Sequence, residues 1–585
     1  MTFILGVSFD YHDSAAALIS DDAIIAAAQE ERFSRIKNDS RLPINAIKFC
    51  CEHAGIQIDA IDYIVYYENA ILKLDRIFQF AKNSSGHTDS DFFKKTIKSW
   101  LRNVKYSPTD KLSEAFEVPR KKIHCVEHHQ SHAASAFYCS PYEEATVVTL
   151  DGVGEYETLT ISHGTNAGLK KLVSVPLPNS IGLFYSAVTA FLGFRVNEDE
   201  YKVMGMAGFG EPEFFSDFMS WFEIKDDGSV TLEQEFFNFL RPDKLPYTRK
   251  MIELFGKPRA QGLEFNPLHG TVRGPGTDRH YANIAASAQK CTEEIILQIC
   301  RKAIQQTKCE NLCMAGGVAL NSLVNGRLKR EITDRLYIQP AAGDAGSALG
   351  AALFFRHEIL KKSKKTILEN PFLGKAYNEA EIDQALNDTF TKDFRRFDST
   401  SKLCSYVAGL LMEGNVVGWI QDGFEWGPRA LGARSILASP LLPEMQDIVN
   451  RKIKFREPFR PFAPAVLPEF ANEYFEMESI NSNLDPEYFM LAVHPVRKEK
   501  RKLIPAVTHV DGTARVQLIN KQTNPIFYEL VKSFGVLTGI PILVNTSFNL
   551  RGEPIVASPG DAIKTFEWSG MDYLVLGQYV IRKEI

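Results

Sequence analysis

The sequence has no apolar run that approaches the ~18 residues of a membrane-spanning helix, so it predicts no transmembrane segment. The first ten residues, MTFILGVSFD, lack basic side chains and reach Asp10 too early for a secretory signal peptide. Nine cysteines are scattered along the chain without any CxxC pair. We therefore expect reduced thiols and a cytoplasmic location, and no disulfide framework.

The chain also lacks an excess of positive charge. It has 67 Lys and Arg against 72 Asp and Glu, which argues against a generic nucleic-acid binder and confines any polyanion site to a local cluster. A length of 585 residues is too great for one hydrophobic core. The sequence therefore predicts several domains of ordinary globular composition.

The sequence does contain a dense group of potential metal ligands in its second hundred residues. His128 and His132 are four residues apart, which places both imidazoles on one face of a predicted helix. A β-branched run at 145–150 predicts a buried strand that ends at Asp151, before a Gly-Val-Gly turn. Imidazole and carboxylate groups together suit a first-row metal ion. The alternative is a surface helix that happens to carry histidines, followed by an ordinary strand and turn.

A strand–turn–strand pattern occurs twice. Residues 3–8 and 15–19 predict a hairpin, and residues 145–161 repeat the pattern. The turn of the first hairpin carries Asp10, His12, Asp13 and Ser14. This repetition predicts a duplicated α/β domain in which both polar turns face one central cleft.

Two later segments extend the predicted site. A short strand at 312–315 leads into Gly316 and Gly317 and then to Asn321, so backbone N–H groups are offered to a phosphate or ribose. Paired glycines also permit tight helix–strand packing, which is the alternative. Asp344 precedes a helix of small residues, where it is either an N-cap or a second carboxylate of the metal site.

Composition suggests where the domains begin and end. We expect a first domain over residues 1–360, a linker over 361–372 and a second domain over 373–585. Within the first domain, aromatic-rich segments at about 70–120 and 211–280 are interpreted as insertions with helical structure.

The second domain contains a basic cluster on an otherwise acidic chain. Between Arg429 and Arg460 there are seven Lys or Arg residues and three Asp or Glu residues, interrupted by prolines and aromatics. Guanidinium and ammonium groups on a fixed loop favour an anion site, although basic runs are also common on plain surfaces. The candidate anion-binding residues are Arg429, Arg434, Lys454, Arg460, Arg515, Asn545, Ser547, Asn549 and Arg551.

Eleven motifs in a fixed order carry a family resemblance. They are HDSAA, EERFSR, HHQSHAASAF, LDGVGE, EYKVMGMAGFG, GGVALN, GDAGSALGA, EWGPRALGARSIL, IKFREPFRPFAPAVL, DGTARVQ and NTSFNLRGEPIV. With them the chain resembles the O-carbamoyltransferases of the nodulation-factor, cephamycin and tobramycin type. The resemblance implies an α/β chain with a duplicated actin-like (ASKHA) N-terminal domain and a YrdC-like C-terminal domain.

The resemblance also implies a reaction. The C-terminal domain would form carbamoyl adenylate from carbamoyl phosphate and ATP, with Mg accompanying ATP. The N-terminal domain would then transfer the carbamoyl group to a hydroxyl of a natural product or sugar, as in antibiotic biosynthesis. The implied partners are ATP, carbamoyl phosphate and a hydroxylated small molecule, with neither nucleic acid nor membrane, and the chain would act as a monomer or homodimer.

Residue roles follow from the same motifs. The implied metal ligands are His128, His132, Asp151 and Asp344, which would hold Fe(II), or else Mn or Zn. His12 would be the general base, unless it is a turn histidine satisfied by Asp10 or Asp13, and Lys37 would lie near the bound adenylate. The implied nucleotide-binding residues are Gly152, Gly154, Gly316, Gly317 and Asn321.

Two other classes remain open from the residues alone. An actin-like sugar kinase would explain the repeated hairpins and the paired glycines, but not the histidine pair or the basic C-terminal motifs. A non-enzymatic nucleotide-binding module would use the same cleft and would bind ATP without any need for carbamoyl phosphate.

Overall fold

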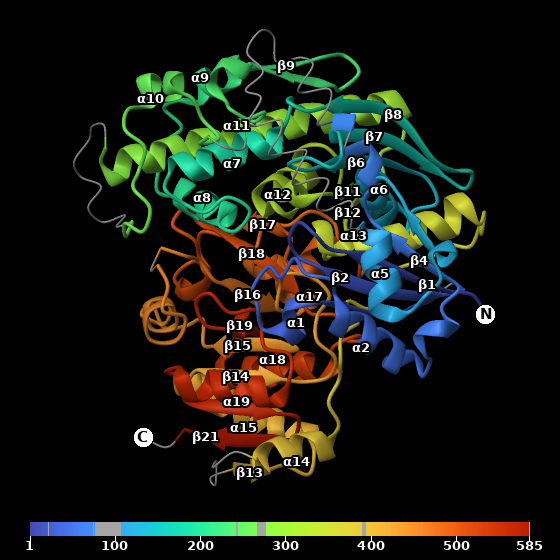
Figure 1. Ribbon diagram of the computed structural model, residues 1–585. Coiled ribbons are helices and arrows are strands. Elements are labelled where there is room, and N and C mark those ends of the chain that lie inside the picture. Colours follow the sequence, from blue (N-terminus) through green and yellow to red (C-terminus); the bar gives the residue numbers. More distant parts are fainter. Residues whose placement is uncertain are drawn as a thin grey trace. The chain divides into compact units, whose positions relative to one another are not determined.

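The computed structural model describes residues 1–21, 23–73, 75–76, 107–241, 244–265, 276–388, 394–457 and 459–583. Most of the insertion predicted at 70–120, and residues 266–275 of the second one, lie outside this described part. The chain folds as two compact units (Figure 1). Unit 1 comprises Met1–Glu30, Ser40–Val324 and Glu331–Ile367, and unit 2 comprises Glu31–Asp39, Asn325–Arg330 and Leu368–Ile585.

Unit 1 contains two five-stranded sheets. In order across the first sheet the strands are β3 (Ala23–Gln29), β2 (Ala15–Ser20), β1 (Phe3–Ser8), β4 (Tyr63–Tyr66) and β5 (Ile123–Cys125). Across the second they are β8 (Gly168–Pro176), β7 (Glu157–Thr165), β6 (Ala145–Leu150), β11 (Leu312–Ala315) and β12 (Leu336–Ile338).

The two sheets share one topology. In each, the first three strands of the chain form an antiparallel meander, and the last two strands run parallel to the first. A parallel neighbour requires a crossover, and the helices α2 (Ile44–Ala54) and α11 (Asp278–Thr307) lie in the corresponding connections. This repeated order confirms the predicted duplicated α/β fold of the N-terminal part.

The remaining described helices of unit 1 lie mainly between β5 and β11. They are α5 (Pro108–Phe116), α6 (His128–Phe137), α7 (Ile181–Phe191), α8 (Glu200–Ala207), α9 (Phe215–Ser220) and α10 (Arg249–Phe255), followed later by α13 (Asp344–Phe354). The second predicted insertion also holds a small antiparallel sheet of β9 (Phe222–Ile224) and β10 (Val230–Leu232). Edge-to-face contacts of Phe184, Phe218 and Trp221 hold α7 and α9 together.

Close packing of α6 against α13 positions the two helices that carry predicted ligands. A Cβ atom added at Gly350 of α13 would lie 1.9 Å from the carbonyl oxygen of Ser131 in α6. Only glycine permits this approach of two backbones, so the small-residue sequence of α13 is required for it. As a result, the first residue of α13, Asp344, can reach the histidines of α6.

Unit 2 is built on a nine-stranded mixed sheet. The strands in order are β13 (Phe394–Arg396), β21 (Tyr579–Arg582), β20 (Tyr573–Leu576), β14 (Val417–Ile420), β15 (Arg434–Ala438), β19 (Ile542–Ser547), β16 (Ala463–Val466), β18 (Thr513–Leu518) and β17 (Ala492–Pro495). The helices are α14 (Glu379–Asn387), α15 (Thr400–Met412), α16 (Met445–Asp447), α17 (Pro468–Tyr474), α18 (Pro525–Thr538) and α19 (Pro559–Trp568). Neighbouring residues such as Ile436 and Leu437 enter separate hydrophobic clusters, so both faces of the sheet are covered. The predicted α/β C-terminal part is confirmed.

Two short segments from earlier in the sequence belong to unit 2. One contains α1 (Glu31–Ser34), and the other is Asn325–Arg330 of α12 (Ser322–Glu331). Lys329 is buried there, with its Nζ atom 2.9 Å from Asp485 Oδ2 and 3.3 Å from Glu487 Oε2. Removing one member would leave a buried charge unpaired, so this cluster fixes the segment in unit 2.

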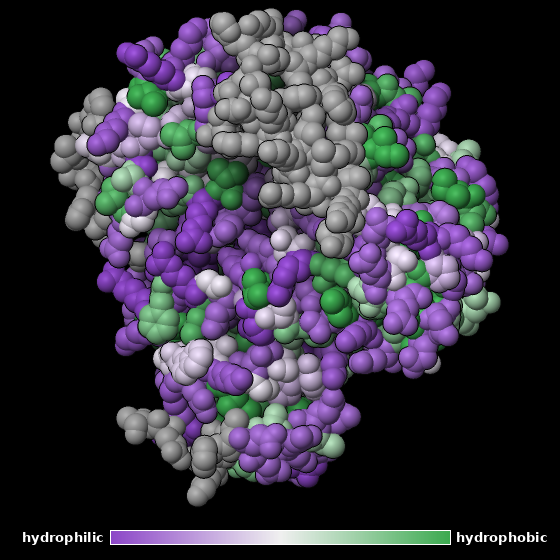
Figure 2. All heavy atoms as spheres, in the orientation of Figure 1, coloured by the Kyte–Doolittle hydropathy of each residue, from purple (hydrophilic) through white to green (hydrophobic). Residues whose placement is uncertain are grey.

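Among the described residues, no helix is both long enough and apolar enough to cross a bilayer. On the face in Figure 2, the coloured hydrophobic residues lie singly or in small groups among hydrophilic ones. Isolated exposed apolar side chains of this kind are normal on a protein surface.

Candidate metal centre and candidate anion site

The four predicted metal ligands lie together in unit 1. His128 begins α6 and His132 follows one turn later, so both side chains leave the same face of the helix. Asp151 directly follows the buried strand β6, and Asp344 is the first residue of α13. One ligand atom from each of the four side chains lies within 4.8 Å of all the others.

The ligand atoms converge on one point. The Nε2 atoms of His128 and His132 are 3.0 Å apart and lie 2.9 and 3.1 Å from Asp151 Oδ2. Asp344 Oδ1 lies 3.6 Å from each of these nitrogen atoms. Asp344 forms no capping hydrogen bond, because the N-cap residue is Gly343, so the N-cap alternative does not describe this side chain.

This arrangement fits a bound transition-metal ion. Ligand atoms about 2.1 Å from one ion are separated by roughly 3.0–3.4 Å along the edges of an octahedron or tetrahedron, and the observed separations bracket that range. The donor set of two imidazoles and two carboxylates is typical of Fe, Mn or Zn. Burial alone would lower the pKa of His128, but Asp344 and Asp151 raise it to about 9. The carboxylates thus favour positive charge at this point of unit 1.

Surrounding residues orient the two histidines. Ser347 Oγ lies 3.0 Å from His132 Nδ1, and the Glu155 carboxylate accepts the backbone N–H of His128 at 3.0 and 3.1 Å. His129 points elsewhere, since its Nδ1 atom lies 2.6 Å from Thr149 Oγ1. Burial holds the pKa of His129 well below its ordinary value, so it is a neutral core histidine.

His12 lies beside the ligand set. It belongs to the turn between β1 and β2, and its Nε2 atom is 3.8 Å from Asp344 Oδ2 while its Nδ1 atom is 3.0 Å from Asp13 Oδ2. Burial opposes protonation, but Asp344 and Asp13 raise the pKa of His12 to about 10. Asp10, the other suggested partner, is instead paired with Lys111 at 2.6 Å.

The backbone N–H groups of the predicted nucleotide-binding glycines have partners inside unit 1. Those of Gly152 and Gly317 point to Asp151 Oδ1 at 2.8 and 3.3 Å, and those of Gly154 and Gly316 point to carbonyl groups. Asn321 exchanges hydrogen bonds with Gln289. A Cβ atom at Gly154 would lie 2.8 Å from His128 Cβ. Gly152 and Gly317 therefore fix the Asp151 carboxylate and Gly154 packs against His128, while adenylate binding by the five residues stays a prediction.

In unit 2, Lys454 joins several of the predicted anion-binding residues. It follows the π-helical turn Ile448–Ile453 and is 3% exposed. Its ammonium group donates to Ser547 Oγ at 3.1 Å and to Asn549 Oδ1 at 2.7 Å. It also donates to the backbone carbonyls of the same two residues. Desolvation, Arg456 and Arg460 hold the pKa of Lys454 well below its ordinary value.

Arg515 on β18 also has other cations as neighbours. Desolvation together with Arg429 and Arg460 holds the pKa of Arg515 well below its ordinary value. Cations that lower one another's pKa are costly to bury together unless an anion compensates them. The structure thus brings Arg429, Lys454, Arg460 and Arg515 into one electrostatically coupled group.

Asn545 and Arg551 complete the predicted set at the end of β19. The buried Asn545 donates to Ala430 O at 3.1 Å and to Gln517 Oε1 at 2.5 Å, which ties it to the loop that carries Arg429. Arg551 is largely exposed, with its Nη2 atom 3.8 Å from Glu457 Oε1.

Arg434 has a different environment from the other cations. It is 0% exposed, and its guanidinium donates to five backbone carbonyls. Those carbonyls belong to Lys375, Gln421, Asp422, Ala433 and Ala557. These contacts engage all three guanidinium nitrogen atoms and fix the surrounding loops.

The sequence reasoning did not single out Glu425 or Glu68. Glu425 Oε1 accepts the backbone N–H groups of Leu431, Ala433 and Arg434, which fixes the arginine-bearing loop. Glu68 Oε1 lies 3.7 Å from His128 Nδ1. Glu425 could have been suspected as an acidic residue in the basic motif EWGPRALGARS, whereas Glu68 stands in no motif.

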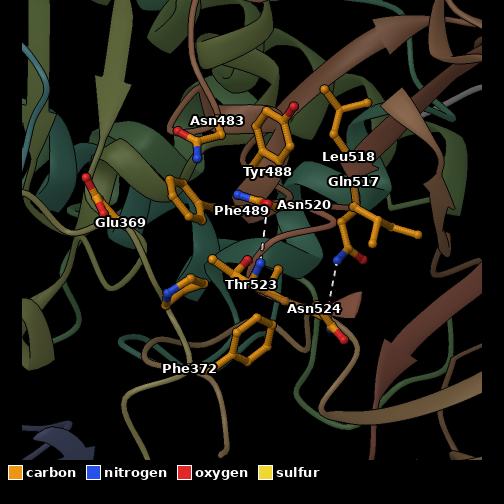
Figure 3. A pocket seen from close by; sticks show the side chains of 13 residues that line it. Glu369, Phe372, Asn483, Tyr488, Phe489, Gln517, Leu518, Asn520, Thr523 and Asn524 are labelled. Carbon is orange, nitrogen blue, oxygen red and sulfur yellow. Dashed lines mark hydrogen bonds between the residues drawn. The ribbon is translucent and has the colours of Figure 1, made fainter. Parts of the chain in front are cut away.

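Unit 2 also has a separate pocket with both polar and apolar side chains in its lining, shown in Figure 3. The side chains of Asn520 and Thr523 lie near the middle of the view, with the ring of Phe489 on one side and Gln517 on the other. None of the predicted anion-binding residues lines this pocket. Gln517 Nε2 donates to Leu431 O at 2.8 Å, so a wall of the pocket braces the loop that bears Arg429.

Comparisons with known proteins agree with these observations. The family description "Carbamoyltransferase N-terminus" matches residues 3–353, and "Carbamoyltransferase C-terminus" matches residues 408–583. The "Uncharacterized protein sll1178" of Synechocystis sp. is 40% identical over 100% of this chain and 97% of its own length. The "Nodulation protein NolNO" of Sinorhizobium fredii is 37% identical over 98% of this chain and 79% of its own length.

The chain belongs to the carbamoyltransferase family, which confirms the family and the enzyme class expected from the motifs. Among solved structures, component A of the Acidaminococcus fermentans (R)-2-hydroxyglutaryl-CoA dehydratase is similar, with a TM-score of 0.32 and 14% identity. That likeness covers 60% of this chain and 97% of the other.

Proposed function

We propose that the protein is an ATP-dependent O-carbamoyltransferase that works in two steps. In the first, unit 2 converts carbamoyl phosphate, ATP and water to carbamoyl adenylate, pyrophosphate and phosphate. In the second, unit 1 transfers the carbamoyl group from the adenylate to the hydroxyl of a small-molecule acceptor, such as a natural product or sugar, and AMP leaves. Family membership supports carbamoyl transfer, and the two sites support the division between the units.

The coupled cations support the first step. Carbamoyl phosphate and ATP together bring several phosphate groups, and bound phosphates would supply the negative charge that Lys454 and Arg515 lack. The neighbouring Arg429 and Arg460 would contact the same phosphates, and Asn545, Ser547 and Asn549 offer uncharged polar groups beside them. Mg²⁺ would accompany ATP, as phosphate groups usually require.

The ligand set of unit 1 supports the second step. His128, His132, Asp151 and Asp344 would hold a divalent ion, with Fe(II) as the first candidate and Mn or Zn as the others. When bound, such an ion supplies positive charge that stabilises negative charge developing on the carbamoyl or phosphate oxygens. Those four side chains, braced by Glu155 and Ser347, would fix the reacting groups at one point of unit 1.

His12 would serve as the general base of the transfer. It would take the proton from the acceptor hydroxyl while the alkoxide oxygen bonds to the carbamoyl carbon. The bond between that carbon and the adenylate oxygen then breaks, and AMP departs with the electron pair. Asp344 and Asp13 favour the protonated form of His12 and raise its pKa to about 10. The base role therefore requires the charge of Asp344 to be neutralised first.

The observation that carries the proposal is the third imidazole, His12, placed 3.8 Å from a carboxylate of a complete ligand set. Pyrophosphate release from ATP, measured with and without carbamoyl phosphate, tests the reaction. A carbamoyltransferase of this kind releases pyrophosphate only when both substrates are present. Release of ADP would indicate a kinase, and release of neither product would indicate a binding module.

A further inference from the structure

An acceptor hydroxyl that is to lose its proton must come within hydrogen-bond reach of His12. His12 lies in the turn between β1 and β2 of unit 1. Lys37, the other residue expected beside the reacting groups, is exposed in the segment Glu31–Asp39 of unit 2. The carbon atoms of the acceptor therefore have to pass beside the neighbours of His12 in its turn, of which Tyr11 is the largest.

Tyr11 packs against His12 and is also open to solvent. The centroids of the two rings are 4.5 Å apart, with an angle of 41° between their planes. Tyr11 is 46% exposed although it stands next to the candidate general base. An exposed aromatic ring beside a reacting group is typical of a ligand-binding surface, because a ligand that packs on the ring removes apolar area from water.

Contacts from two other segments fix this turn. Lys111 of α5 pairs with Asp10 at 2.6 Å, and Asn197 Nδ2 donates to the Tyr11 hydroxyl at 3.2 Å. Asn197 lies in the connection between α7 and α8, where its backbone N–H donates to Glu200 Oε1 at 2.8 Å. Tyr11 is therefore held by three segments of unit 1 and not by its own turn alone.

The polar atoms of Tyr11 and Asn197 can still bind a ligand. The Tyr11 hydroxyl accepts the bond from Asn197, and among the described residues no acceptor takes its own proton. Desolvation together with the charges of Asp344 and Asp151 raises the pKa of Tyr11 to about 12, so the phenol keeps this proton at neutral pH. Asn197 is exposed, and in the described part of the chain its Oδ1 atom accepts no hydrogen bond. One donor and one acceptor thus remain beside the Tyr11 ring.

We infer that Tyr11 and Asn197 form an acceptor surface beside His12, and that the acceptor presents a saturated, hydroxylated ring to this surface. The C–H face of such a ring packs on Tyr11, and hydroxyl groups at its edge exchange hydrogen bonds with the Tyr11 hydroxyl and with Asn197 Oδ1. An open-chain alcohol has no flat face and loses more conformational freedom on binding. The inference rests on the proposed function for the reaction and adds the residues that select the acceptor.

The test uses methyl β-D-glucopyranoside as the ring probe and sorbitol as an open-chain probe with similar hydroxyl groups. Binding of each probe to the full chain is measured by saturation-transfer NMR, alongside carbamoylated product, pyrophosphate release and bound metal. We expect wild type to bind the glucopyranoside more tightly than sorbitol. Tyr11→Leu should weaken glucopyranoside binding about tenfold through loss of the aromatic contact, and sorbitol binding about twofold at most.

Two further variants separate the parts of the acceptor surface. Tyr11→Phe keeps the ring and removes only the hydroxyl, so it should weaken glucopyranoside binding less than Tyr11→Leu does. Asn197→Gly removes the amide, and glycine adopts the φ of 64° at this position without strain. Asn197→Gly should weaken the same probe about threefold to tenfold, as expected for lost hydrogen bonds. The control Phe470→Leu changes an exposed aromatic residue on α17 of unit 2 and should match wild type.

The outcomes distinguish this inference from the proposed function. Equal weakening of both probes by Tyr11→Leu, or unchanged glucopyranoside binding in both Tyr11→Leu and Asn197→Gly, would overturn the inference. Wild type that binds neither probe, or loss of metal in Tyr11→Leu, would also overturn it. If wild type binds the glucopyranoside through Tyr11 but releases no pyrophosphate from ATP and carbamoyl phosphate, the acceptor surface stands and the proposed reaction fails.

Discussion

The two candidate sites are electrostatic opposites. In unit 1, buried carboxylates surround imidazoles, and the pKa of His128 is raised to about 9 despite burial. In unit 2, the buried Lys454 and the partly exposed Arg515 have other cations as neighbours, and desolvation together with these neighbours holds the pKa values of Lys454 and Arg515 well below their ordinary values. The carboxylates of the first site thus favour positive charge on their neighbours, whereas the cations of the second site disfavour it.

This difference indicates which ligand each unit needs. A buried group of one charge sign is costly until a partner of the other sign binds. Unit 1 is therefore suited to a cation and unit 2 to a polyanion. If His128→Ala or Lys454→Met impaired both sites equally, that result would contradict the separation of the two sites.

The largest expected effect is on carbamoyl transfer after His128→Ala. Loss of one of two imidazole ligands should remove most of the bound metal and slow transfer about 1000-fold, because the ion's charge stabilisation is worth several kcal/mol. Pyrophosphate release should persist. Metal analysis and product assays with added acceptor check both results.

A histidine outside the site provides the control for this substitution. His163 of β7 lies 2.8 Å from Glu144, in the same unit, so His163→Ala should retain metal and transfer activity. Loss of pyrophosphate release in His128→Ala would mean that both half-reactions depend on the metal centre.

The next effect concerns stability and divides the cations of unit 2. Arg434→Met should lower the free energy of unfolding by about 3 kcal/mol or more, because several backbone carbonyls lose a charged donor. Arg429→Met, at a partly exposed position, should change unfolding little and weaken anion binding instead. Urea unfolding and calorimetric binding distinguish the two roles, and equal destabilisation of both variants would contradict them.

The arginines of unit 2 also illustrate what could and could not be predicted from the sequence. Hydrophobic periodicity located the strands at 3–8, 145–150 and 312–315, because strand patterns are local. The four candidate metal ligands could be predicted because each stands at the end of a strand or in a short helix motif. A basic run, however, looks the same whether an arginine faces a ligand, as proposed for Arg429, or backbone carbonyls, as Arg434 does.

Contacts between residues far apart in the chain could not be predicted from the sequence, for a different reason. Arg32 meets Gly427 across 395 residues, and no spacing rule connects them. By its position in the sequence the motif EERFSR was expected to belong to the N-terminal domain, whereas the structure groups all of it except Glu30 with unit 2. Similarly, Glu68 lies near His128 only because β4 and α6 fold into the same unit.

A smaller loss is expected when the anion site loses its central cation. Lys454→Met should weaken binding of ATP or carbamoyl phosphate about 30-fold, within the range for charge-assisted hydrogen bonds. The exposed Lys452, two residues earlier, offers the matched control Lys452→Met. Bound metal should be unchanged in both variants, and metal loss in Lys454→Met would break the separation of the two sites.

The smallest expected effect tests how the metal ligands are oriented. Glu68 is buried and pairs with Lys73 at 2.8 Å, while its other oxygen faces His128 Nδ1, which has no hydrogen-bond partner among the described residues. A carboxylate in that position commonly holds the ring of a metal-binding histidine, and its loss typically lowers metal affinity about tenfold or more. Glu68→Gln should lower the metal affinity, measured by competition with a chelator, and should leave pyrophosphate release unchanged. Unchanged affinity would mean that α6 alone orients His128, through the Glu155 contact to its backbone.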